Sequence, residues 1–211
     1  MIDREQLRTG NNALLRSRGI QVNEFLPLLE EPSVLQPLAP GAAEIARRCM
    51  VLNHLIGIGF GGHPPTLKAA VEKWGLWSEA SERERGILSC DSHDEQERTD
   101  AMWLVECVQS FAWCLGVAGL PHLEGCEADL ASKFPPPLSD PAEFIARARL
   151  RPFEEIYREA DYHYRLHWAT RQARLSGQPF GRYEGLVMER RKALDWAIGA
   201  EADWDSVGDC T

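Results

Sequence analysis

Almost uninterrupted apolar residues make up segment 101–120, which reads AMWLVECVQSFAWCLGVAGL. It is long enough for a membrane-spanning helix, which needs about 20 residues. However, Glu106 and Gln109 lie inside it, and no basic cluster flanks it to orient it in a bilayer. A charge at mid-span costs roughly 3 kcal/mol on insertion scales. A helix surrounded by other helices has the same composition without that cost, so we expect a buried central helix over about residues 93–119.

Helical signals also precede this segment. Asp3 is placed to cap a first helix that runs to about residue 18. Four prolines between residues 27 and 40 exclude a continuous helix there. From residue 42, apolar residues recur at helical spacing. The patterns Ser81-x-x-Glu84 and Ser92-x-x-Glu95 are each typical of a capping box that opens a helix.

The C-terminal part of the chain continues the helical pattern. Asp140-Pro141-x-Glu143 predicts a helix start, Pro152 kinks or restarts that helix, and a final helix spans about residues 183–200. No convincing alternation of apolar and polar residues predicts a strand. The sequence therefore predicts an all-α fold with one compact multi-helix domain, residues 1–211, whose helices group into 1–65, 66–120 and 140–200.

The charge of the chain limits its partners. Among 211 residues, 32 are acidic and 23 basic, which gives a formal charge of −9 at pH 7. This balance disfavours nucleic acid and anionic membranes, because both attract cationic surfaces. Residues 147–192 are an exception, with eleven bases and six acids. The six cysteines show no metal-binding spacing, and the amino terminus lacks the apolar stretch of a secretory signal. We therefore expect a cytoplasmic protein with reduced thiols and no cofactor.

Short motifs occur in order along most of the chain. The most specific is Tyr164-Arg165-x-His167-Trp168-Ala169. The others are Arg18-Gly19-Ile20, Glu44-Ile45-Ala46-x-Arg48, Trp103-x-x-Glu106, Leu150-Arg151-Pro152, Glu155-Ile156, Asp161, Glu189-Arg190-x-x-Ala193-Leu194-x-Trp196 and Trp204-Asp205-x-Val207. In these motifs the chain resembles the bacterial family called domain of unknown function 4272. The resemblance implies a small, mainly helical cytoplasmic protein with no established activity.

The chain departs from this family pattern at two places. Where Glu-Arg-His is expected, the chain has Glu189-Arg190-Arg191. Where Thr-Asp-Thr is expected at the terminus, it has Asp209-Cys210-Thr211. The resemblance therefore carries no catalytic role for a histidine or an aspartate at those two positions.

The candidate site is a set of charged residues that we call the polar cluster: Glu106, Asp161, Arg165, His167, Glu189 and Arg190. Asp161 and Arg165 are four residues apart, so they can form an ion pair on one helix face. Arg190 falls between apolar residues and points to the core, where Glu106 or Asp161 is a candidate partner. The cluster could orient a carboxylate or phosphate, with His167 as a general base near neutral pH. The alternative is a structural network that locks helix register.

Two further patterns carry weaker signals. His163 and His167 have the i, i+4 spacing of metal-binding histidines, but Tyr164 replaces the glutamate of His-Glu-x-x-His and no third ligand is evident. We therefore predict no metal site. Segment 57–62, GIGFGG, formally matches G-x-G-x-x-G, but a helix pattern precedes it and His63-Pro64-Pro65 argues against a helix directly after it. We expect a loop there.

Two classes of function remain open at this level. The favoured class is a non-enzymatic protein-binding module with a basic protein partner, such as a bacterial immunity or antitoxin-like protein. Acid-rich stretches at 79–100 and 201–209 support it, and no catalytic motif is complete. The alternative is an enzyme or small-anion-binding protein that uses the polar cluster. The partner and the oligomeric state stay open.

Overall fold

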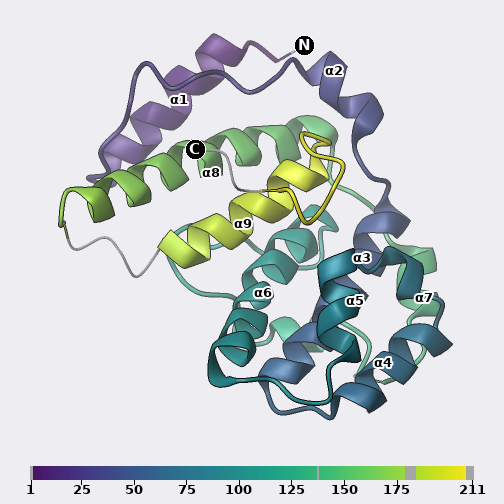
Figure 1. Cartoon of the computed structure of the whole chain (residues 1–211). Helices are drawn as coiled ribbons and strands as arrows, with labels where there is room; N and C mark the ends of the chain where they lie inside the picture. The colour runs from purple at the N-terminus through teal and green to yellow at the C-terminus, as the bar shows by residue number, and fades with distance from the viewer. Residues whose placement is uncertain (1, 137, 179–183, 208–211) are drawn as a thin grey trace. The chain divides into compact units, whose positions relative to one another are not determined.

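The structure is a computed structural model of the chain, and it describes residues 2–136, 138–178 and 184–207 (Figure 1). Every regular element in these ranges is a helix, which confirms the predicted all-α fold. The chain groups into two compact units, of which the first contains residues 1–40 and 151–211 and the second contains residues 41–150. Both ends of the chain thus belong to the same unit, and the single domain of 211 residues stays a prediction.

The helices divide between the two units as follows. The first unit holds α1 (Arg4–Ser17), α2 (Pro32–Leu35), the 3₁₀ helix η1 (Gln36–Leu38), α8 (Phe153–Leu175) and α9 (Glu184–Ala197). The second unit holds α3 (Ala42–Gly59), α4 (Pro64–Lys73), η2 (Trp77–Glu79), α5 (Glu82–Ser89), α6 (Glu95–Cys114), η3 (Leu130–Lys133) and α7 (Ala142–Arg147).

The core of the second unit lies where α3 packs against α6. Ile45, Leu52 and Leu55 of α3 and Cys107 and Phe111 of α6 are completely buried. Burial of a large apolar side chain contributes roughly 1.5–3 kcal/mol, so this contact supplies a large part of the stability of the unit. The predicted buried helix in segment 101–120 is thus confirmed, and its buried part is the C-terminal half of α6.

Both ends of α6 differ from the predicted range of 93–119. Asp94, and not Ser92, caps the helix: its carboxylate accepts the Glu97 N–H at 2.8 Å, and the Glu97 carboxylate accepts the Asp94 N–H at 2.9 Å. Aspartate caps as well as serine does, and its negative charge also favours the helix N-terminus. The helix stops at Cys114 because Gly116, with φ of +72°, adopts the left-handed conformation that ends helices.

The predicted capping box at the start of α5 is confirmed, and it also contains a buried ion pair. Ser81 Oγ accepts the Glu84 N–H at 3.2 Å, while Glu84 Oε2 accepts the Ser81 N–H at 2.9 Å. The other carboxylate oxygen of Glu84 pairs with Arg48 of α3, which also donates to the Glu79 carbonyl at 2.7 Å. Arg48 and Glu84 are 3% and 4% exposed. Arg48, the last residue of the Glu44-Ile45-Ala46-x-Arg48 motif, thus joins α3 to α5 through a buried ion pair.

The glycine-rich segment 57–62 differs from the predicted loop, because α3 continues to Gly59. A Cβ atom at Gly59 would lie 2.6 Å from Met102 Cγ and 2.9 Å from the Arg98 carbonyl, so glycine allows α3 and α6 to approach closely. The expectation that the prolines prevent a helix directly after the segment is also wrong, since α4 begins at Pro64 with His63 as its N-cap. Proline is tolerated in the first helical turn, where its missing N–H needs no partner.

In the first unit, α8 contacts both the N-terminal segment and α9. Arg18 donates to the Tyr162 hydroxyl at 2.8 Å, and the Tyr157 hydroxyl donates to the Glu30 carbonyl at 2.9 Å. Asp3 caps α1 as predicted, by accepting the N–H of the third helical residue at 3.0 Å. The bonds made by Arg18 and Glu30 span 144 and 127 sequence positions, so they hold the segment around these two residues against α8.

Three remaining predictions concern the membrane, the thiols and the chain end. Within the described ranges, no helix is both long and apolar enough to cross a membrane. The described cysteines, at 49, 90, 107, 114 and 126, are free thiols. The predicted start of the last helix at Tyr183 and the terminal Asp209-Cys210-Thr211 lie outside the described residues.

Candidate functional site

Five of the six residues of the polar cluster lie on two helices of the first unit. Asp161, Arg165 and His167 lie on α8, and Glu189 and Arg190 lie on α9. Asp161 and Arg165 are each 2% exposed, and Arg190 is 0% exposed. His167 is also buried, whereas Glu189 is half-buried. Four of the five polar-cluster residues on α8 and α9 are therefore closed to solvent. Arg190 is buried, as predicted.

The predicted ion pair of α8 is present. Arg165 Nε and Nη2 donate to the two Asp161 carboxylate oxygens at 2.8 and 2.7 Å, which is the bidentate geometry that suits a guanidinium. Asn11 of α1 donates to the same carboxylate at 2.8 Å. Both oxygens of Asp161 are thus occupied by Arg165 and Asn11, so this buried carboxylate has the partners that burial of a charged group requires.

A second linked group joins α8 to α9 through residues that the sequence interpretation missed. Arg191 Nη1 donates to His167 Nδ1 over 3.0 Å, and Arg191 Nε donates to an Asp195 carboxylate oxygen at 3.0 Å. The Arg191 guanidinium lies 4.8 Å from the centre of the Tyr164 ring, a cation–π contact. We call His167, Arg191 and Asp195 the α8–α9 link. Arg191 is the residue at the departure from the family's expected Glu-Arg-His.

The α8–α9 link perturbs two protonation equilibria in opposite directions. Burial, reinforced by the charges of Arg191 and Arg171, lowers the pKa of His167 to about 4. Burial also raises the pKa of Asp195 to about 6, and the adjacent Arg191 only partly opposes this. Because Arg191 can only donate, His167 accepts through Nδ1 and carries its proton on Nε2. The hydrogen bond to Nδ1 and the lowered pKa disfavour His167 as a general base near neutral pH, and its catalytic role stays a prediction.

Glu106 lies on α6 of the second unit and has a structural partner there. It is 4% exposed and accepts the Cys126 N–H at 3.0 Å. One turn later, the Gln109 side chain accepts the Glu127 N–H at 2.8 Å and donates to the Gly119 carbonyl at 2.6 Å. Both polar residues inside the apolar segment thus anchor the loop that follows α6. The predicted pairing of Arg190 with Glu106 would join the two units and stays a prediction.

The histidine pair of α8 has no metal-binding arrangement in the described part of the chain. His163 is fully buried, and its Nδ1 lies 3.1 Å from both the carbonyl and a carboxylate oxygen of Glu159. No group of three or more histidine, cysteine or acidic side chains among the described residues could hold a metal ion. His163 and His167 therefore contact different partners, in spite of their i, i+4 spacing.

The protein is thus an all-α protein whose first unit contains two buried polar groups between packed helices: one joins α1 to α8, and the α8–α9 link joins α8 to α9. Such groups can hold helix register and orient side chains, and the members of each are engaged with one another. The chain belongs to the family described as Domain of unknown function (DUF4272), whose model matches residues 7–207. This confirms the family that the motifs resemble. No match was found among curated proteins or among solved structures.

Proposed function

We propose that this protein is a non-enzymatic protein-binding module whose partner is a basic protein, as in bacterial immunity and antitoxin-like proteins. The observation that carries the proposal is the exposure of the acidic residues in segment 79–100. Glu82, Asp91, Glu95 and Asp100 are exposed, as are the two acids of the α6 capping box, Asp94 and Glu97.

These acids form a charged surface on α5, the loop after it and the first turns of α6. Segment 79–100 contains eight acids against three bases. Within the described residues, none of the six exposed acids forms an ion pair, whereas the buried Glu84 is neutralised by Arg48. Exposed carboxylates without counter-charges attract a basic surface over about one Debye length, roughly 8–10 Å at physiological salt. Complementary charge of this kind raises association rates and selects partners.

The polar cluster supports this proposal more than it supports the enzymatic alternative. Asp161, Arg165 and Arg190 are nearly inaccessible, and the Asp161 carboxylate is already bound by an arginine and an asparagine. A substrate anion would have to displace these groups from a buried position. His167, which would be the general base of an enzyme, already accepts a hydrogen bond from Arg191.

The experiment is affinity capture from the native host with the tagged full-length chain, followed by identification of the bound protein. We expect a basic protein that is released when the salt concentration rises from about 0.05 to 0.5 M, because exposed charges are then screened. The variant Asp91→Asn/Glu95→Gln/Asp100→Asn removes three exposed acids of the segment and should lose the partner. Asp94 and Glu97 are kept, because they cap α6.

A matched control variant removes three exposed acids elsewhere: Glu30→Gln/Glu72→Gln/Glu154→Gln. This control changes the net charge by the same amount as the first variant and should still bind the partner. For the immunity or antitoxin class, expression of the captured protein alone should arrest growth, and co-expression with the wild-type chain should restore it. A partner-free chain from the host, or equal capture by both variants, would overturn the proposal.

A further inference from the structure

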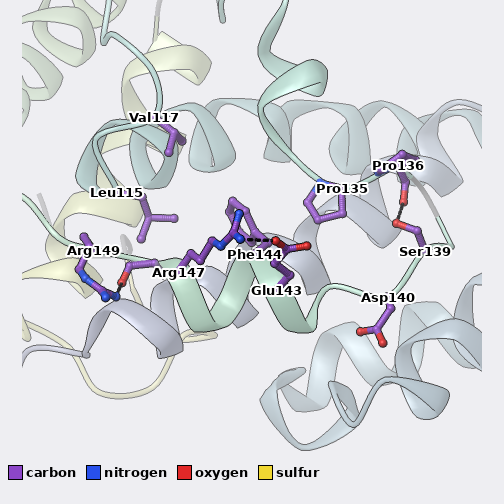
Figure 2. Close-up of a pocket in the computed structure, with 11 residues that line it drawn as sticks. Leu115, Val117, Pro135, Pro136, Ser139, Asp140, Glu143, Phe144, Arg147 and Arg149 are labelled. Atoms are coloured by element: carbon purple, nitrogen blue, oxygen red, sulfur yellow. Dashed lines mark hydrogen bonds and ion pairs between the residues drawn. The ribbon is translucent and has the colours of Figure 1, made fainter.

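The second unit contains an open groove that is separate from the acidic surface described above. It is bounded by α7, by the turn after α6 and by Pro135, Pro136, Ser139 and Asp140, and its volume is about 520 Å³ (Figure 2). Ligand pockets for small molecules typically measure 300–1,000 Å³, so the groove has the size of a site for one small ligand.

Apolar side chains form much of its lining. Leu115 and Val117 line it from the turn after α6, Pro135 lines it from the opposite side, and Phe144 projects from α7. Leu115 is buried, whereas Val117 is 40% exposed. Together, the exposed valine and the half-buried phenylalanine present apolar area in the groove that a hydrocarbon or aromatic group can cover.

The two ends of the groove carry charges of opposite sign. Figure 2 shows Arg149 at one end and Asp140 at the other, with Arg147 and Glu143 between them. Arg147 pairs with Glu143 at 2.6 Å, and both side chains are more than 70% exposed. In the described part of the chain, Arg149 forms no ion pair, and it donates from Nη1 to the neighbouring Ala148 carbonyl at 2.7 Å. Among the described residues, Arg149 is thus a cation without a counter-charge at the end of a partly apolar groove.

We propose that this groove binds an apolar monocarboxylate, that is, a small carboxylic acid with an aromatic or aliphatic body. The body covers Leu115, Val117 and Phe144, and the carboxylate pairs with Arg149. A guanidinium binds a carboxylate through two parallel hydrogen bonds, which orient the ligand along the groove. The site is independent of the proposed protein partner.

The neighbouring charges define the ligand class further. Among the described residues, Arg147 pairs with Glu143, and such solvent-exposed ion pairs contribute little to stability. Glu143 therefore competes with the incoming carboxylate for the positive charge of Arg147, while the ligand itself pairs with Arg149. At the other end, Asp140 is exposed and its carboxylate only accepts the Ala142 N–H at 2.8 Å. This carboxylate repels a second anionic group, so dicarboxylates and phosphate esters of similar size bind more weakly.

The test is a titration of the full-length, isotope-labelled chain with 4-phenylbutyrate, followed by two-dimensional NMR of backbone amides. We expect saturable shifts that include the amides of Val117, Phe144 and Arg149. The uncharged analogue 4-phenylbutyramide should bind about tenfold more weakly, because it cannot form the charged pair.

Three variants separate the proposed roles. Arg149→Gln should weaken 4-phenylbutyrate binding about tenfold, while Glu143→Gln should strengthen it a few-fold by removing the competing carboxylate. Arg98→Gln, which neutralises an exposed arginine of α6 outside the groove, should leave the affinity unchanged. Shifts that do not saturate below about 10 mM, equal affinity for the amide, or unchanged binding by Arg149→Gln would each overturn the proposal.

Discussion

The opposite pKa shifts of His167 and Asp195 predict a pH dependence that appears only when one of the two groups is removed. Asp195→Asn keeps an oxygen that can accept from Arg191, and His167→Gln does the same on α8. Each variant therefore removes one titrating group from the α8–α9 link while retaining a hydrogen-bond acceptor for Arg191.

The sign and size of this pH dependence follow from the link between proton binding and folding. The pKa of Asp195 rises from 3.8 to about 6 on folding, so the folded chain binds more protons between these values. The free energy of unfolding therefore falls as the pH rises from about 4 to 6, by about 3 kcal/mol at about 1.4 kcal/mol per pH unit. For His167, whose pKa falls from 6.5 to about 4, the unfolded chain binds more protons. The free energy of unfolding then rises by about 3 kcal/mol between about pH 4 and 6.5.

In the wild-type chain the two contributions oppose each other and nearly cancel. In Asp195→Asn only the histidine contribution remains, so its free energy of unfolding, compared with that of wild type, should rise by about 3 kcal/mol as the pH goes from 4 to 6. His167→Gln should lose a similar amount over the same range. The measurement is urea denaturation at pH 4, 5, 6 and 7, followed by tryptophan fluorescence and circular dichroism.

Asp100→Asn and His63→Gln serve as controls, since both residues are exposed and lie in the second unit. Differences from wild type that stay constant with pH in Asp195→Asn and His167→Gln would refute the reasoning. Slopes of the same sign in the two variants would refute it as well. Either result would mean that the link does not perturb its two groups in opposite directions.

Three further substitutions test the fold. Arg48→Met should lower the free energy of unfolding by about 3–5 kcal/mol, because it leaves the buried carboxylate of Glu84 without a counter-charge. Urea denaturation measures this loss, and a loss below about 1 kcal/mol would contradict the buried ion pair. Gly59→Ala should destabilise by about 1–3 kcal/mol through overpacking against α6, whereas Gly10→Ala, which has no atom within 4 Å of its added Cβ, should be neutral or stabilising in the same assay. Asp94→Ala should lower the free energy of unfolding by about 1 kcal/mol because the helix cap is lost, while Ser92→Ala should change it by less than about 0.5 kcal/mol. A larger effect of Ser92→Ala would show that the serine caps α6.

Local features of this protein were largely predictable from sequence. The caps at Asp3 and Ser81 depend on side chains within three residues of the helix start, and the ion pair of Asp161 with Arg165 depends on helical spacing alone. Even so, local rules allow alternatives: both Ser92 and Asp94 stand before α6, and the aspartate caps it. The Arg191–Asp195 pair also has i, i+4 spacing, so this part of the α8–α9 link carried a readable signal.

Some properties of the candidate site depend on burial and on close approach between helices that are distant in sequence. His167 and Arg191 are 24 residues apart, and no local pattern places their side chains 3.0 Å apart. The pKa of His167 falls because packing removes water from the imidazole and brings a guanidinium to it, so a residue with a base-like sequence context becomes a hydrogen-bond acceptor. Likewise, only the packing of α3 on α6 explains why Gly59 is needed. The sequence by itself determined the helices, the family and the acidic charge, because these follow from neighbouring residues and composition. The tertiary structure decided which charges are buried, paired or left exposed, because solvation and distance exist only once the helices have packed.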